Sequence, residues 1–265
     1  MTAIALTIAG SDSGGGAGIQ ADLKAFSALG VYGASVITAI TAQNTQAVTA
    51  VHEVPAGIVG AQIDAVLSDI DVNAVKLGML FSPAIIERTA EALAGHDIPV
   101  VLDPVMIAKS GDALLQDDAV GALTNHLLPR AALLTPNLPE AARLLNENVA
   151  DTPQDAERQG KALIARGARA VLMKGGHGRG ETCLDLLVTE DGSVQFTAPR
   201  RATKNTHGTG CTLSSAIAAG LAKGDELEHA VRSAHEYLQR AIIAGDDLQI
   251  GQGHGPVHHF AGVWA

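Results

Sequence analysis

Aromatic and basic residues are scarce in this sequence. Aromatic side chains make up only 3% of the 265 residues, whereas 47% of the residues are hydrophobic. A core therefore has to be built from Ala, Val, Ile and Leu, a composition typical of a parallel sheet covered by helices. The 18 Lys and Arg residues face 28 Asp and Glu residues, which gives a net charge of −10. This excess of acid argues against a nucleic-acid partner, because binding a phosphate backbone needs a basic face.

Cysteine and long apolar runs are also lacking. The two cysteines, Cys183 and Cys211, are too few for a disulfide-stabilised scaffold, so we expect two free thiols in a reducing compartment. No stretch approaches the ~18 consecutive apolar residues of a membrane span. The short apolar run at the N-terminus has no basic residue before it, unlike a signal peptide. We expect a cytoplasmic protein without a membrane partner, in which residues 1–265 form a single domain.

Apolar strand-like runs alternate with helical stretches along most of the chain. This alternation predicts a doubly wound α/β fold, with a mostly parallel central sheet, right-handed crossovers and flanking helices. Two alternating runs around Glu190-Asp191-Gly192 predict a small antiparallel hairpin at one edge. The predicted strands are residues 3–9, 31–41, 74–80, 99–102, 131–134, 170–173, 183–188 and 193–198; the predicted helices are residues 20–29, 55–67, 83–94, 117–126, 152–166 and 225–244, with another that starts at Thr212.

The stretch KNTHGTGCTLSS, residues 204–215, is the strongest candidate for a site of chemistry. Gly208 and Gly210 lie on a loop that leads into an apolar helix. The start of such a helix offers unpaired N–H groups and a positive dipole end, and so forms an anion site. The same field is expected to help Cys211 lose its proton and act as a base or nucleophile. Alternatively, the glycines only turn the chain and Cys211 is a small buried hydrophobe.

A second glycine-rich loop, GSDSGGGAG, follows the first predicted strand. Neither common phosphate-binding motif fits it. The dinucleotide pattern starting at Gly14 would need a glycine where Ile19 stands, and a P-loop would need Gly-Lys-Ser/Thr, which is absent. A backbone-lined pocket or a mobile flap remains, with Asp12 as a side-chain acceptor.

Polar or sulfur-containing side chains stand at the carboxyl ends of the other predicted strands. Ligands of open α/β sheets bind in the crevice at these ends, so one crevice is expected to collect these side chains. Each one also has an ordinary explanation, such as a polar turn, a loop cap or a helix cap. The residues concerned are Gln43, Met79, Asp103, Asn137, Glu140 and Lys174.

Eight segments, read in order, resemble a known family. They are AGSDSGGGAGIQADLK, TAQNT, KLGML, LDPVM, AKSGDALL, LTPNLPEA, LMKGGH and NTHGTGCTLSSAIA. Together they are similar to the hydroxymethylpyrimidine/phosphomethylpyrimidine kinases of thiamine biosynthesis, within the ribokinase-like superfamily. The resemblance covers almost the whole chain. It implies transfer of phosphate from ATP, with Mg²⁺, to 4-amino-5-hydroxymethyl-2-methylpyrimidine and then to its monophosphate, in a protein that is usually a homodimer.

The resemblance also implies roles for individual residues. The pyrimidine substrate would be bound by Gly10, Asp12, Ala17, Gln43, Met79, Met106 and Lys109. ATP would be bound by Asn137, Lys174, Thr206 and Gly208, and Mg²⁺ by Asp103 and Glu140. The transfer itself would take place at Gly208, Gly210 and Cys211.

The sequence departs from the wider superfamily at Cys211 and Asn205, where that superfamily has Asp; the pyrimidine kinases also have Cys at the first position. Our hypothesis is that Cys211 is a thiolate base for the alcohol, worth ~10²–10⁴-fold, and a spectator when the monophosphate is the acceptor. The rival functions are a pyridoxal/pyridoxine kinase, a cysteine hydrolase that pairs Cys211 with His207, and a non-catalytic pyrimidine sensor. The His-rich tail fits no metal pattern and is interpreted as a packed C-terminal turn.

Overall fold

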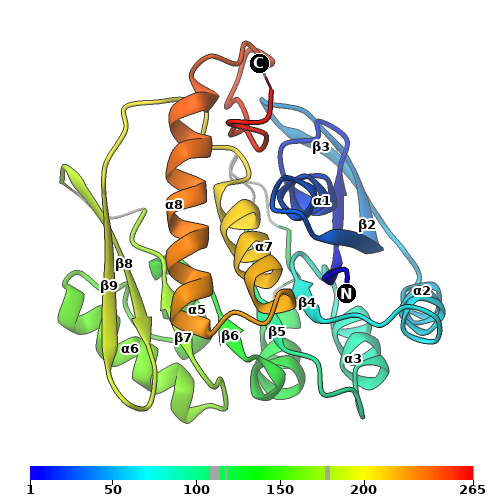
Figure 1. Cartoon of the computed structure of the whole chain (residues 1–265). Helices are drawn as coiled ribbons and strands as arrows, with labels where there is room; N and C mark the ends of the chain where they lie inside the picture. Colours follow the sequence, from blue (N-terminus) through cyan, green and yellow to red (C-terminus); the bar gives the residue numbers. More distant parts are fainter. Residues whose placement is uncertain (108–113, 117, 177–179, 265) are drawn as a thin grey trace.

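The computed structural model describes residues 1–107, 114–116, 118–176 and 180–264, and in this part of the chain nine strands form one sheet (Figure 1). The strand order is β3-β2-β1-β4-β5-β6-β7-β8-β9. Six strands are parallel: β1 (Ile4–Asp12), β2 (Tyr32–Gln43), β4 (Ala74–Leu77), β5 (Val100–Leu102), β6 (Leu133–Leu134) and β7 (Val171–Met173). Antiparallel strands complete both edges: β3 (Val48–Glu53) pairs with β2, and β8 (Thr182–Val188) and β9 (Ser193–Pro199) follow β7.

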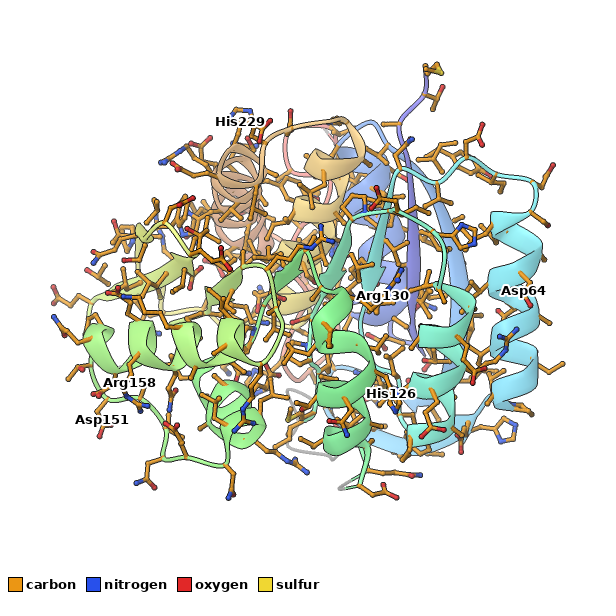
Figure 2. The ribbon with its side chains drawn as sticks, turned by 90° about the horizontal axis from the view of Figure 1, so that it is seen from below. Asp64, His126, Arg130, Asp151, Arg158 and His229 are labelled. Atoms are coloured by element: carbon orange, nitrogen blue, oxygen red, sulfur yellow. The ribbon has the colours of Figure 1, made fainter. Side chains whose placement is uncertain are left out.

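Helices cover both faces of this sheet. One face carries α1 (Gly18–Ala28), α7 (Thr209–Ala222) and α8 (Leu227–Gly245), which share one apolar cluster. The other face carries α2 (Ala56–Leu67), α3 (Pro83–Ala92), α4 (Ala119–Ala122), α5 (Leu138–Leu145) and α6 (Pro153–Ala165). Two short helical turns, Leu123–Leu127 and Leu128–Arg130, directly follow α4. Figure 2 shows Asp64, His126 and Arg158 on helices of this second face, opposite His229 of α8.

Strand β1 shows how the sequence produces two cores. Leu6 and Ile8 pack into the cluster under α2 and α3. Ala5, the residue before Leu6, points to the other face and packs into the cluster under α1 and α7. Side chains of a strand alternate between its two faces, so a strand covered on both sides has to be apolar throughout. This explains the continuous apolar runs in the sequence and places the polar residues at the strand ends.

The predicted fold class is confirmed, including the hairpin of β8 and β9 at one edge. Three local predictions differ from the structure. Strand β3 was not predicted, because all of its side chains are at least partly exposed and its pattern is that of a loop. The strand predicted to reach residue 80 ends at Leu77. The helix predicted from residue 117 is the four-residue α4 followed by a π turn, and residue 117 lies outside the described residues. None of the described helices is long and apolar enough to cross a membrane.

Candidate functional site

A cavity of about 660 Å³ lies at the carboxyl ends of the parallel strands. Its wall is formed by the ends of β1, β2, β4, β5 and β7, by the starts of α5 and α7, and by parts of β8, β9 and α8. Fourteen residues singled out from the sequence border it: Gly10, Asp12, Ala17, Gln43, Met79, Asp103, Met106, Asn137, Glu140, Lys174, Thr206, Gly208, Gly210 and Cys211. Lys109 lies outside the described residues. The expected gathering of strand-end side chains in one crevice is therefore confirmed.

Asp12 organises the glycine-rich loop that follows β1. Its Oδ1 accepts the N–H of Gly14 at 2.8 Å, and its Oδ2 accepts the N–H groups of Gly16 at 3.0 Å and Ala17 at 2.8 Å. His207 Nε2 lies 2.9 Å from the same Oδ2. Burial raises the pKa of Asp12, but the hydrogen bond with His207 and those with the loop amides outweigh it and hold the pKa below its ordinary value. The carboxylate is thus engaged by the loop that it shapes.

The start of α7 touches this glycine-rich loop. Gly208 has a left-handed backbone, with φ of 79°, and a Cβ at this position would overlap the carbonyl oxygen of Gly16. Only glycine satisfies both constraints. The contact sets the first turn of α7, which begins at Thr209, against the cavity. The first amides of a helix have no intrahelical acceptor, so this turn presents donors and the positive dipole end to the cavity.

Lys174 and Asp103 form an ion pair that borders the cavity. Lys174 Nζ lies 2.7 Å from Asp103 Oδ1, which Thr135 Oγ1 also approaches at 3.1 Å. Burial raises the pKa of Asp103, but the charges of Lys174 and Lys76 outweigh it and lower the pKa. A Cβ on Gly210 would lie 3.4 Å from Lys174 Nζ. The lysine therefore stands beside the first turn of α7.

Asn137 and Glu140 cap helix α5 at the edge of the same cavity. The N–H of Glu140 donates to Asn137 Oδ1 at 2.8 Å, and the N–H of Asn137 donates to Glu140 Oε2 at 2.7 Å. This is a complete capping box, so Glu140 has the ordinary role of a helix cap in addition to any role in the cavity. Burial nevertheless raises the pKa of Glu140 to about 7, and the charge of Asp103 adds to this while that of Lys174 opposes it. Among the described residues no group of three or more His, Cys, Asp or Glu side chains forms a metal cage.

An apolar slot forms the other end of the cavity. Met79 and Met106 are buried there, and the Met79 sulfur packs so closely on the backbone that a Cβ on Gly10 would lie 3.0 Å from it. Gln43 stands at the rim, where its Nε2 lies 3.4 Å from His207 Nε2 and its Oε1 lies 3.2 Å from Thr41 Oγ1. An apolar slot with an amide at its rim suits a small heteroaromatic ring.

Cys211 borders the cavity, but its thiol is not the acidic one that we expected. Burial raises the pKa of Cys211 to about 11, and the charge of Lys76 lowers it without offsetting burial. The prediction that this thiol is easy to deprotonate is therefore wrong, because desolvation of the thiolate and the charges of Asp22 and Asp103 outweigh the charge of Lys76. Both cysteines are free thiols, as predicted.

Two features of the site were missed in the sequence. Lys76 and Asp22 form a fully buried ion pair, and Lys76 borders the cavity. The available signal was a lysine inside the apolar run AVKLGML and an aspartate on the apolar side of a helix, since such charges are buried only in pairs. His207 was considered only as a hydrolase partner of Cys211. Its structural partner is Asp12, 195 positions away, which no sequence spacing reveals.

Comparison with known proteins gives one consistent result. The family model described as phosphomethylpyrimidine kinase matches residues 12–258. A hydroxymethylpyrimidine/phosphomethylpyrimidine kinase of Rhizobium meliloti is 60% identical over 264 residues, covering 100% of this chain and 99% of that protein. The crystal structure of a phosphomethylpyrimidine kinase from Clostridium difficile 630 is 46% identical, covers 90% of this chain and 99% of its own, and has a TM-score of 0.80. An ADP complex of Bacillus subtilis pyridoxal kinase is 36% identical, covers 98% of each chain, and has a TM-score of 0.90.

Proposed function

The chain belongs to the phosphomethylpyrimidine kinase family, and we propose that it phosphorylates 4-amino-5-hydroxymethyl-2-methylpyrimidine with ATP and then phosphorylates the monophosphate to the diphosphate. It is a phosphotransferase. The observation that best supports the proposal is the arrangement of one cavity, in which an anion-binding helix start and Lys174 face an apolar slot closed by Gln43. A donor phosphate and a ring alcohol can meet there without a further domain. We therefore treat residues 1–265 as one kinase domain.

The first turn of α7 and Lys174 would hold the phosphates of ATP. The loose transition state of phosphoryl transfer gains most from positioning and from donors aimed at the equatorial oxygens. Helix α7 supplies such donors, and Lys174 adds a positive charge beside Gly210. Asn137 and Thr206, which border the same end of the cavity, would complete the nucleotide site.

Asp103 and Glu140 suit a magnesium ion that arrives with the nucleotide. Mg²⁺ is usually held by one or two carboxylates together with substrate phosphates and water, so a complete protein cage is not needed. Glu140 is a buried carboxyl whose pKa is raised to about 7, and a nearby cation would stabilise its ionised form. When bound, Mg²⁺ would neutralise charge on the phosphates.

The slot would bind the ring of the acceptor. Met79 and Met106 would pack on the two ring faces, Gln43 would pair with the ring nitrogen and amino group, and Gly10 and Ala17 would line the edge. Asp12 would act indirectly, by fixing the glycine-rich loop at Gly14 to Ala17. Because burial raises the pKa of its thiol to about 11, Cys211 would contribute its backbone N–H and its volume to the transfer site, and not a base.

A count of the phosphates transferred tests the proposal. Purified protein is incubated with ATP, Mg²⁺ and the pyrimidine alcohol, and the products are analysed by mass spectrometry. We expect a diphosphate, with the monophosphate as an intermediate. Pyridoxal is offered in competition, because the similar Bacillus subtilis structure is a pyridoxal kinase. A single added phosphate, or a preference for pyridoxal, would contradict the proposal.

We also propose that the protein is a homodimer and acts in the cytoplasm. The homodimer is proposed from the family resemblance, and the cytoplasm from the two free thiols and the need for ATP. Light scattering coupled to size exclusion measures the mass in solution against the chain mass of 27.1 kDa. A mass that stays at one chain over the accessible concentration range would contradict the dimer.

A further inference from the structure

The buried ion pair of Lys76 and Asp22 is oriented toward the cavity. Lys76 Nζ lies 3.0 Å from Asp22 Oδ1 and 2.8 Å from Oδ2, and both side chains are 0% exposed. Of the two residues, Lys76 borders the cavity and Asp22 does not. The positive end of the pair therefore faces the cavity, with the negative end behind it.

The protein holds the negative end in place with two further hydrogen bonds. Thr7 Oγ1 donates to Asp22 Oδ2 at 2.6 Å, and Ser215 Oγ donates to Oδ1 at 2.6 Å. Ser215 lies on α7, one turn after Cys211, so the pair is fixed to the helix whose start forms the anion site. Both oxygens of Asp22 are thus saturated. Lys76 Nζ has three N–H groups. Among the described residues, its hydrogen bonds go to the Asp22 carboxylate.

Stability alone does not explain such a pair. Replacing a buried ion pair by uncharged residues of similar shape is often neutral or stabilising, whereas breaking it is costly. Burial lowers the pKa of Lys76, but the charge of Asp22 outweighs it and raises the pKa, so the amine remains charged. A charge without solvent contact is only weakly screened by salt and acts across the wall of the cavity.

The place of Lys76 indicates which ligand group its charge serves. It stands on β4, the strand that leads to Met79 in the apolar slot, and its charge acts on Cys211 at the start of α7. A Cβ on Gly78 would lie 2.7 Å from Nζ, so the glycine leaves room for the ammonium group directly under the slot. Lys174 lies against Asp103 at the end of the cavity assigned to ATP. Lys76 therefore lies beneath the slot and the start of α7, and its charge also reaches Asp103.

We propose that Lys76 and Asp22 are positioning residues for the second transfer, in which the buried positive end of the pair offsets the phosphate charge of the acceptor. The inference rests on the proposed function. The alcohol is neutral and gains little from this charge, whereas the monophosphate enters a cavity that Asp12, Asp103, Glu140 and Asp185 also border. The pair thus makes one cavity suitable for both acceptors.

The double variant Lys76→Met/Asp22→Asn tests this proposal. It removes both charges without changing the net charge, and the Asn amide can still pair with the hydroxyls of Thr7 and Ser215. We expect kcat/KM for the monophosphate to fall about tenfold more than kcat/KM for the alcohol, which equals about 1.4 kcal/mol. The loss should lie mainly in KM, because the charge acts on the bound acceptor before and during transfer. Calorimetric titration with the monophosphate alone should show the same weakening.

A matched control removes an exposed pair. Arg158 and Glu147 lie 2.7 Å apart on the sheet face away from α7, where Figure 2 labels Arg158. The variant Arg158→Met/Glu147→Gln should leave the ratio of the two kcat/KM values unchanged. A merely structural role of Lys76 and Asp22 would lower both activities equally and would overturn the proposal, as would an unchanged ratio.

The fold of the variant is measured by cooperative thermal unfolding, with Lys76→Met/Asp22→Leu as a second uncharged replacement. If neither double variant unfolds cooperatively, the pair belongs to the folding core and the proposal is wrong. The same measurements distinguish failure of the kinase function from failure of the role of Lys76. A wild-type protein that adds only one phosphate contradicts the bifunctional kinase itself, whereas two added phosphates with an unchanged ratio in the variant contradict only the role of Lys76.

Discussion

The Nε2 atom of His207 lies 2.9 Å from Oδ2 of Asp12 and joins two loops that are 195 positions apart. The pKa of Asp12 is held low despite burial, so the carboxylate is ionised and accepts, and Nε2 must carry the hydrogen. His207 is itself fixed by the C-terminal segment, because its N–H donates to Gly255 at 3.0 Å and its carbonyl accepts from Val257 at 3.4 Å. The glycine-rich loop, the start of α7 and the C-terminal segment therefore meet at this one hydrogen bond.

Replacing Asp12 by Asn should disturb this junction. Asn offers one acceptor oxygen and turns an NH₂ group toward donors that Asp12 satisfies, so we expect a loss of about 1–3 kcal/mol in the free energy of unfolding. Because the folded protein lowers the pKa of Asp12, this carboxylate stabilises the fold at pH values above its unfolded pKa of 3.8. The stabilisation is lost as the pH falls through the lower pKa of the folded state. The difference from wild type should thus be full at pH 7 and smaller below pH 3.8.

Urea unfolding of wild type and Asp12→Asn at several pH values measures this difference. The control is Asp97→Asn, which changes an exposed carboxylate and should follow wild type at every pH. A difference that stays constant below pH 3.8 would show that the loss is not due to the charge of Asp12.

A methyl group at Gly208 should damage the transfer site more than the fold. Gly208→Ala combines a left-handed backbone with an overlap on Gly16, whereas Gly224→Ala, at the end of α7, has φ of 88° and no neighbour within 4 Å. The control should cost only the backbone strain, about 1 kcal/mol, with activity retained. Gly208→Ala should cost more and should lower kcat at least tenfold, because the first turn of α7 moves away from the cavity. Equal effects of the two variants on kcat would contradict the close-approach argument.

Much of this fold could be predicted because its rules are local. Apolar runs and helical periods place the six parallel strands, and the strand-end rule gathers Gln43, Asp103 and Lys174 in one cavity. Strand β3 was missed because an exposed edge strand carries no apolar alternation. Edge strands gain their order from main-chain bonds to a neighbour, here β2, and these bonds leave no mark in the sequence of β3.

The electrostatics of the site could not be predicted in the same way. The helix start at Thr209 predicts an acidic thiol at Cys211, but desolvation and the charges of Asp22 and Asp103, which come from elsewhere in the chain, raise its pKa. The pairing of Lys76 with Asp22 likewise joins positions 54 apart on a strand and a helix. Sequence shows which groups can carry charge, and tertiary packing decides which of them do.

The raised pKa of Cys211 predicts an unreactive thiol. In a Cys183→Ser background, which leaves Cys211 as the remaining cysteine, alkylation by iodoacetamide should be slow at pH 8 and rise toward a midpoint of about 11. Cys211→Ala should lower transfer to the alcohol by less than the ~10²–10⁴-fold that a general base contributes. Rapid alkylation at pH 8 together with a larger loss of activity would restore the thiolate base that the structure argues against.

Glu140 gives the stability of the protein a distinct dependence on pH. Burial raises its pKa from 4.5 to about 7, so the folded protein binds a proton that the unfolded chain has already lost between these two values. A raised folded pKa stabilises the protein fully below pH 4.5, and this contribution is lost as the pH rises through about 7. Relative to Glu140→Gln, the free energy of unfolding of wild type should therefore fall by about 1.4 kcal/mol per pH unit at most within this window.

Glu140→Gln is a clean comparison because Gln at the same position can still accept the N–H of Asn137 and preserve the capping box. Urea unfolding is measured from pH 4.5 to 8 in the presence of EDTA, with the exposed Glu190→Gln as the control. The control should run parallel to wild type, whereas Glu140→Gln should gain on it as the pH rises and level off above pH 7. Parallel curves for all three proteins would mean that Glu140 is ionised throughout this pH range. The carboxyl would then not be protonated in the absence of a cation, which would contradict the prediction.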